Sequence, residues 1–416
     1  MVIDRFLQYV SFDTTSDEAS ETCPSTEKQK KLAAFLVEEL KNAGLADAHM
    51  DENGYVYAHL AASKGRESDP ALALISHMDT SPAASGASVK VSRVPYAGGD
   101  ITLANGVKIT PETTPELAHL IGETLLVTDG TTLLGADDKA GVAEIVETVA
   151  QLAAAPRLPH PAISVCFTPD EEIGRGADRI DMGEVNAAYG YTVDGGMLGE
   201  IEYENFNAAG ARIVFHGVNI HPGSAKDVMK NACLMARDYL SRLPEKEDPA
   251  HTAGYEGFYH VTGISGDEVT AEVRMILRDH DRDRFEERKA TAARIAREVE
   301  AIWGDGSVEC HITDSYYNMR EKILPCMFLI DNAKAAMQAA GVTPIVQPIR
   351  GGTDGARLSY MGLPCPNLST GGINFHSVRE CIPEGALVKM VEVLLRLVAL
   401  RFSSSIQQNG QGDARF

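Results

Sequence analysis

The sequence predicts an α/β fold with a mostly parallel mixed sheet, flanking helices and an inserted α+β domain. Short apolar runs alternate with helical segments over the first two hundred residues, as in sheets covered by helices on both faces. From about residue 207 apolar and polar residues alternate instead, which is typical of half-buried antiparallel strands. The first rhythm returns near residue 318, so the second domain is expected to be inserted into the first. A chain of 416 residues is long enough for two domains.

The first domain contains one strongly periodic helix near its start. Leu32, Leu36 and Leu40 recur on one face of a helix over residues 25–43, and Gly44 provides its stop. The following segments predict strands at 71–76 and 124–130, a helix at 139–155, and strands at 162–167 and 187–193. The role of the Gly- and Pro-bearing insertion at 84–120 is left open.

The inserted domain is predicted to combine antiparallel strands with two helices. Its strands are expected at 211–218, 257–266 and 268–279, and its helices at 224–243 and 283–303. The predicted domain limits are 1–206 with 318–416 for the first domain and 207–317 for the insertion. The polar tail from about residue 404 is expected to be disordered.

Composition excludes several classes of partner. A formal charge of −21 makes nucleic acids and anionic membrane surfaces poor partners. The start of the chain lacks the basic residues and apolar centre of a signal peptide.

The apolar stretch 386–400 contains Lys389, Glu392 and Arg396, which indicates an amphipathic helix and not a membrane span. Seven cysteines without a CxxC pair favour a reducing, cytoplasmic location.

Clusters of acidic and histidine residues follow the predicted strands. In "SVCFTPDEEIGRG" three adjacent carboxylates come directly after an apolar run, although adjacent negative charges repel one another. Further clusters follow other strands or lie late in the chain: His77 with Asp79, Asp137 with Asp138, Asp194, and His376. Loops at the carboxyl ends of parallel strands share one edge of the sheet, so these clusters predict one converged site.

The types of side chain in these clusters point to divalent metal ions. Histidine and carboxylate ligands suit zinc and its neighbours without any thiolate. Two ions that share a bridging carboxylate would use five ligands, and the five available are His77, Asp137, Glu172, Asp194 and His376. Taken singly, the aspartate pair could cap a helix and the acidic run could be a solvated turn. Their joint occurrence favours the metal site.

The motifs "SHMDTSP", "TLLGADDKAGVAEI", "FTPDEEIGRG", "YTVDGG", "HPGSAK" and "IRGGTDGARLS" resemble the M20 family of metallopeptidases over nearly the whole chain. Within that family they are similar to the bacterial tripeptide aminopeptidases. The resemblance implies a zinc-peptidase-like catalytic domain and an inserted lid and dimerisation domain. It also implies two Zn²⁺ per subunit, with Co²⁺ or Mn²⁺ as substitutes, and a homodimer.

The resemblance also assigns roles to the ligands. Asp137 would bridge the two ions, His77 and Asp194 would complete one shell, and Glu172 and His376 would complete the other.

Other roles come from the same resemblance. Asp79 would hold His77 in place, Glu171 would be the general base, and the Asp137–Asp138 peptide would be cis. Because adjacent residues of a strand face opposite ways, Glu171 and Glu172 require a turn, for which Gly174 is suited.

The expected reaction is removal of the N-terminal residue from tripeptides, with a hydroxide between the ions as nucleophile. Selection by length needs a cation for the C-terminal carboxylate, and Arg278 and Arg350 are the candidates. His221 resembles a histidine that contacts the substrate carbonyl. Each of the three could instead be structural.

Other functions stay open. A dipeptidase, carboxypeptidase or N-acyl amino-acid deacylase of the same family would use the same chemistry with a different pocket. A non-catalytic binding protein on this fold is a further alternative. A dinucleotide-dependent oxidoreductase is disfavoured, because "GADDKAG" lacks the GxGxxG spacing.

Overall fold

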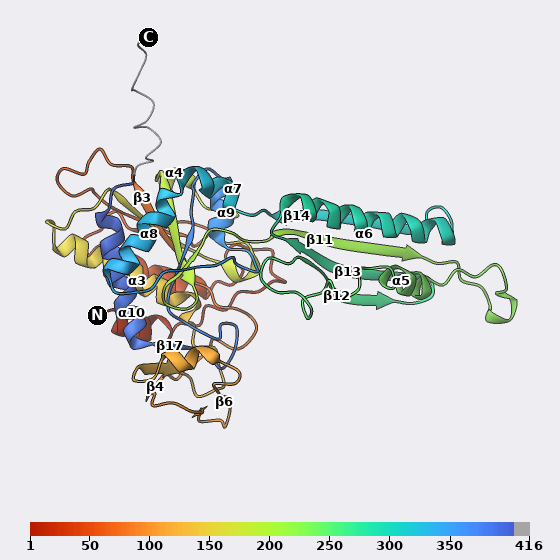
Figure 1. The fold of residues 1–416 in the computed structure, drawn as a ribbon, viewed down its shortest axis with the longest axis horizontal. Helices are drawn as coiled ribbons and strands as arrows, with labels where there is room; N and C mark the ends of the chain where they lie inside the picture. Colours follow the sequence, from red (N-terminus) through yellow and green to blue (C-terminus); the bar gives the residue numbers. More distant parts are fainter. Residues whose placement is uncertain (403–416) are drawn as a thin grey trace, which may run out of the picture. The chain divides into compact units, whose positions relative to one another are not determined.

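The computed structural model of the chain describes residues 1–402, which divide into two compact units (Figure 1). Within the described residues, unit 1 comprises Met1–Tyr203, Met319–Gln347 and 353–402. Unit 2 comprises Glu204–Asn318 and Pro348–Gly352. The tail predicted to be disordered, from about residue 404, lies outside the described residues.

Unit 1 is built on an eight-stranded mixed sheet. Its strands, in spatial order, are β1 (His49–Met50), β2 (Val56–Leu60), β8 (Ile163–Thr168), β3 (Leu72–His77), β9 (Tyr189–Gly195), β16 (Asn367–Ser369), β10 (Glu200–Glu202) and β15 (Ile345–Val346). β8, β3, β9 and β16 are mutually parallel, whereas β2 and β10 run antiparallel to β8 and β16. Every residue of β3 and β8 is buried, as expected for central strands covered on both faces.

Helices cover both faces of this sheet. They are α1 (Val2–Tyr9), α2 (Gln29–Asn42), α3 (Ala136–Ala154), α4 (Met182–Val185), α7 (Arg320–Ile323), α8 (Phe328–Ala339), α9 (Asp354–Tyr360) and α10 (Glu384–Ala399). Ile75 of β3 packs in one core with Leu358 of α9 and Val185 of α4. The next residue, Ser76, points the opposite way toward α3, against which α1 and α10 pack. The predicted α/β class is therefore confirmed.

The insertion at 84–120 contributes strands to two small sheets that are separate from the main one. β4 (Ser92–Pro95), β7 (Thr124–Val127) and β17 (Cys381–Pro383) make a three-stranded antiparallel sheet, and β5 (Ile101–Thr102) pairs with β6 (Lys108–Ile109). The strand predicted at 124–130 exists, but it does not join the main sheet. Leu125 and Val127 of this strand are buried with Ile101, Ile109 and Leu117 in a second, smaller apolar cluster, here called the satellite core.

Unit 2 is a two-layer α/β structure. Its antiparallel sheet has the order β12 (Phe258–Gly266), β13 (Thr270–Asp279), β11 (Asn207–His216) and β14 (Val308–Tyr316). α5 (Ala232–Leu240) and α6 (Arg282–Trp303) pack on one face through an apolar core (Figure 1). The sequence analysis did not predict β14.

One helix of unit 2 is shorter than predicted. A helix was expected over 224–243, but α5 begins only at Ala232. Asn231 ends the preceding loop by capping the helix, because its side chain accepts a hydrogen bond from the amide of Leu234 at 3.1 Å. Pro222 lies in a separate short 3₁₀ turn.

Residues 348–352 group with unit 2, as do residues 204–206 and Asn318, whereas the predicted limits place all of them in the first domain. Ile349 donates its amide to Glu204 and accepts a hydrogen bond at its carbonyl from His280. These contacts anchor the segment to unit 2. The predicted limits of the two domains otherwise stay a prediction. Among residues 1–402, no helix combines the length and apolar character needed to cross a lipid bilayer.

Candidate metal centre

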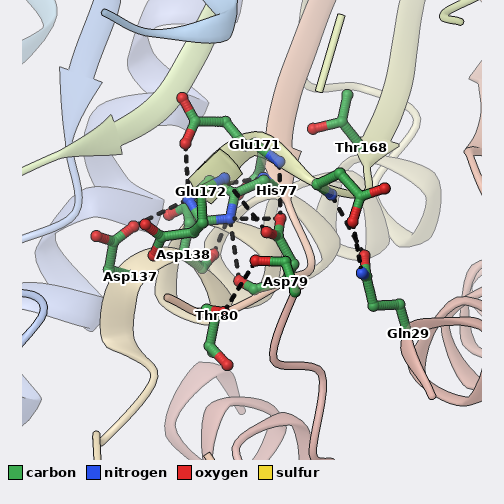
Figure 2. Close-up of polar contacts among 12 residues, drawn as sticks. Gln29, His77, Asp79, Thr80, Asp137, Asp138, Thr168, Glu171 and Glu172 are labelled. Atoms are coloured by element: carbon green, nitrogen blue, oxygen red, sulfur yellow. Dashed lines mark hydrogen bonds and ion pairs between the residues drawn. The ribbon is translucent and has the colours of Figure 1, made fainter. Parts of the chain in front are cut away.

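Three neighbouring parallel strands bring most of the acidic clusters to one edge of the main sheet. His77 ends β3, Asp194 lies near the end of β9, and Glu171 and Glu172 follow β8. The predicted turn is present: Glu171–Ile173 is a short 3₁₀ helix, and Gly174 has a φ of +72°. This turn lets two adjacent glutamates point into the same site (Figure 2).

Asp137 and His376 reach the site by other routes. Asp137 lies at the start of α3 with non-helical φ and ψ of −85° and 102°, and its peptide bond to Asp138 is cis, as predicted. His376 lies in the loop between β16 and β17 with a φ of +59°. Neither residue follows a strand of the main sheet directly, so the shared-edge argument does not account for them.

Asp137 lies between the two histidines. Its Oδ1 is 2.9 Å from Nε2 of His77, and its Oδ2 is 3.1 Å from Nε2 of His376. Nε2 of His77 is also 3.3 Å from Oδ1 of Asp194, and Nε2 of His376 is 2.7 Å from Oε2 of Glu172. Two groups able to hold a metal ion therefore share Asp137: His77 with Asp194, and His376 with Glu172.

The buried, crowded carboxylates of this site favour the binding of cations. Burial raises the pKa of Asp194 to about 6, and burial together with the Asp137 charge raises the pKa of Glu172 to about 7. Hydrogen bonds to Asp137 and Glu172 raise the pKa of His376 to about 10. One carboxylate oxygen of Glu172 is buried without a hydrogen-bond partner among the described residues. Divalent ions would displace the imidazole protons and neutralise the crowded carboxylates.

Comparison with known proteins gives the family. Residues 129–400, well over half of the chain, match the family described as Peptidase family M20/M25/M40. The chain belongs to this family. It is 52% identical to Peptidase T of Desulfitobacterium hafniense over 402 residues, which cover 96% of the chain and 98% of that protein. It is 50% identical to Peptidase T of Halothermothrix orenii with the same coverage.

Solved structures share the fold. The aminopeptidase PepT of Bacillus cereus superposes with a TM-score of 0.75 at 22% identity, covering 96% of this chain and 97% of that one. A tripeptidase of Staphylococcus aureus gives 0.75 at 21% identity with the same coverage. A dinuclear metal-binding peptidase of the M20 family from Bacillus subtilis gives 0.64 at 15% identity, covering 96% of both chains. The predicted M20 family and its two-domain fold class are thus confirmed, and the chain is a metal-dependent peptidase.

Asp79 connects both sides of the M20 site. Its Oδ1 lies 3.3 Å from Nδ1 of His77, on the ring side opposite Asp137, and its backbone carbonyl accepts a hydrogen bond of 3.1 Å from the same nitrogen. The same carboxylate accepts hydrogen bonds from the amides of Glu171 at 3.0 Å and Glu172 at 3.2 Å. Asp79 is fully buried. It therefore fixes the orientation of the imidazole and the position of the glutamate turn together.

Replacing Asp79 by alanine should lower metal affinity or turnover by about 10- to 100-fold. The 171–173 turn would lose its anchor, and His77 would keep only the backbone carbonyl of residue 79 as a partner for Nδ1. Metal titration followed by peptide-hydrolysis kinetics measures both quantities. Asp181→Ala is the matched control, since Asp181 also accepts two backbone amides but caps α4. Unchanged metal affinity and turnover in Asp79→Ala would contradict this positioning role.

Two further carboxylates, neither of them a predicted metal ligand, fix the segment around Asp137. Glu380 is buried and accepts hydrogen bonds from the amides of Leu134, Gly135 and Asp137 at 2.7, 2.8 and 3.0 Å. Asp138 accepts from the amide of His77 at 3.1 Å and from the Ser76 hydroxyl. Asp138 was noticed as a possible helix cap, whereas nothing in the pattern around Glu380 distinguishes it from a surface glutamate.

The three predicted substrate residues all lie in unit 2. The Arg350 guanidinium donates to the carbonyls of Thr252, Gly254 and Glu256 and to the Thr252 hydroxyl. Arg278 donates to the carbonyls of Ala209 and Leu277, with its guanidinium carbon 5.3 Å from the centre of the Tyr316 ring. His221 is exposed and accepts from the amide of Gly223. Their role toward substrate stays a prediction.

Proposed function

We propose that this chain is an aminopeptidase that removes the N-terminal residue of tripeptides with a pair of metal ions. One observation carries the proposal: the two oxygens of Asp137 each face a different histidine, and each histidine has its own second carboxylate. The identity of about 50% to Peptidase T sequences over nearly the full chain supports the aminopeptidase activity.

The donor set fits two small divalent ions. His77 and Asp194 would hold one ion, Glu172 and His376 the other, and Asp137 both. Imidazole with carboxylate is a ligand set that zinc accepts, and Co²⁺ or Mn²⁺ are the expected substitutes. Bound there, the ions supply acidification of the attacking water and polarisation of the scissile carbonyl.

Glu171 is the proposed general base. Its Oε2 lies 4.0 Å from Nε2 of His77, so it is next to the group of His77 and Asp194 without belonging to either group. Burial, together with the Asp194 charge, raises the pKa of Glu171 well above its usual value. A carboxylate of raised pKa accepts a proton from the attacking water and returns it to the departing amine.

The tripeptide preference requires an anchor for the C-terminal carboxylate of the substrate. Arg278 is the stronger candidate, because the contacts of Arg350 with residues 252–256 already use both of its terminal nitrogens. His221 is proposed to contact the substrate carbonyl. The homodimer, the lid role of unit 2 and the cytoplasmic location stay predictions.

The decisive experiment combines metal analysis with hydrolysis of peptides of different length. We expect two ions per chain, cleavage of Ala-Ala-Ala with release of the N-terminal alanine, and loss of activity on chelation that zinc restores. Dipeptides, tetrapeptides and N-acetylated tripeptides should be poor substrates. Strong hydrolysis of the acetylated peptide would support the deacylase or carboxypeptidase alternative. Full activity after complete metal removal would refute the metal mechanism.

A further inference from the structure

A cavity of about 370 Å³ lies in unit 1, apart from the residues assigned to the metal centre. Its wall comes from four segments: residues 116–123 after β6, Met197 and Leu198 between β9 and β10, the two ends of the loop between β16 and β17, and the first two turns of α10. Small-molecule sites typically have volumes of about 300–1,000 Å³, so this one has room for a compact ligand. Leu120, Met197 and Ile373 supply apolar surface to it.

The cavity borders the loop that carries His376 and Glu380. The backbones of Ile373 and Cys381 exchange two hydrogen bonds of 2.9 and 3.1 Å, which close this loop at its base. Both residues belong to the satellite core of the insertion. Ile373 therefore has one side in the cavity wall and is at the same time part of the closure that positions His376.

Further contacts of the loop, close to its base, also come from the insertion. Nδ2 of Asn374 donates to the Thr114 hydroxyl at 3.0 Å, and Nε of Arg379 donates to the carbonyl of Lys108 at 2.9 Å. The insertion thus anchors the 373–381 loop through these two hydrogen bonds. The cavity lies where the insertion, the loop and α10 meet, so a ligand there would contact all three.

The charges around the cavity are mainly negative. Glu116 and Glu123 line it, and neither carboxylate forms an ion pair with a cation within residues 1–402. The Lys389 ammonium, which also borders the cavity, is already bonded to the Ala340 carbonyl at 3.0 Å and to Glu392 at 2.8 Å. Two unpaired carboxylates beside an apolar wall suit a ligand with an ammonium group on a branched apolar chain.

We propose that this cavity is a second ligand site, which binds the ammonium end of an apolar amino acid or short peptide. The ammonium would lie between Glu116 and Glu123, and the side chain against Leu120, Met197 and Ile373. Such a ligand would stabilise the closed base of the 373–381 loop. The choice of amino acids and short peptides within the class of apolar amines rests on the proposed function, since these are its products.

The test uses 3-methylbutylamine as the probe, on the metal-loaded protein, with calorimetry and hydrogen exchange as readouts. We expect the amine to bind, and 3-methylbutanol and 4-methylpentanoate to bind at least about tenfold more weakly, because they lack the charge that pairs with the acids. The double variant Glu116→Gln, Glu123→Gln should lose about tenfold in amine affinity. Glu112→Gln, in the same insertion but outside the cavity, should not. Amine binding should slow exchange of the Ile373 and Cys381 amides.

Two results would overturn the proposal: equal affinity of the amine and the alcohol, or unchanged amine affinity in the double variant. The binding measurement needs no peptide hydrolysis. Failure of the proposed aminopeptidase activity would therefore leave this result standing, and an empty cavity would leave the activity standing. Binding of leucine and of Ala-Leu at the same cavity would then distinguish the product class from apolar amines in general.

Discussion

Replacing Glu171 by alanine is expected to abolish peptide hydrolysis while metal content stays near normal. The Glu171 carboxylate lies 4.0 Å from His77 but belongs to neither ligand group, so its removal takes away proton transfer and leaves the metal-binding side chains intact. General acid–base catalysis typically contributes about 100- to 10,000-fold, and the turnover number should fall by at least that much. Metal analysis of the same sample, together with Ala-Ala-Ala kinetics, measures the two properties separately.

The neighbouring glutamate provides the matched control. Glu172→Ala should lose the ion shared with His376, because Oε2 of Glu172 lies 2.7 Å from Nε2 of that histidine. The two variants remove the same group from adjacent positions of one turn, so they differ in role and hardly in local structure. Equal metal loss from both would mean that Glu171 is itself a ligand and that the assigned roles are reversed.

The half of the site that follows the central strands of the main sheet can be predicted from the sequence by a physical rule. β8, β3 and β9 are neighbours and parallel, so the residues at their carboxyl ends must share one edge. Each strand is a mainly apolar run followed by a charged group or histidine, which is why His77, Glu172 and Asp194 stand out. Gly174 also predicted the turn that both glutamates need.

The positions of the other two ligands, Asp137 and His376, cannot be predicted from that rule. Asp137 and His376 adjoin β7 and β17, which pair in a separate antiparallel sheet. What brings them to the main sheet is the satellite core of the insertion and the three amides that Glu380 accepts. These contacts join segments that are far apart in the chain, so no local periodicity of the sequence predicts them. Only the resemblance to the M20 family indicated the roles of these two residues.

The errors in unit 2 have a similar origin. The amphipathic pattern extends over 224–243, but the helix begins only after Asn231, which caps its N-terminus. A capping asparagine within an amphipathic pattern cannot be distinguished by sequence from any other polar residue. β14 was missed although Val308, Cys310 and Ile312 pack against the core as an alternating series. Its exposed positions carry charged and polar groups that make an edge strand resemble a loop.

Replacing Asp137 by alanine should have a larger effect on metal content than any other single ligand change. Asp194→Ala or Glu172→Ala removes a ligand from one group, whereas Asp137 belongs to both. We therefore expect Asp137→Ala to retain almost no metal after dialysis, and hydrolysis of Ala-Ala-Ala to fall below detection. Quantification of bound zinc in the three variants checks the order.

Asp137→Asn sharpens this test, because it keeps the shape of the side chain and removes its charge. The amide offers one oxygen, and its nitrogen would face the Nε2 of a histidine where an acceptor is now. At most one ion should bind, weakly, and the circular dichroism spectrum should stay that of the parent protein. Two tightly bound ions in Asp137→Asn would show that the histidine–carboxylate pairs hold their metals independently, and the bridging role would have to be abandoned.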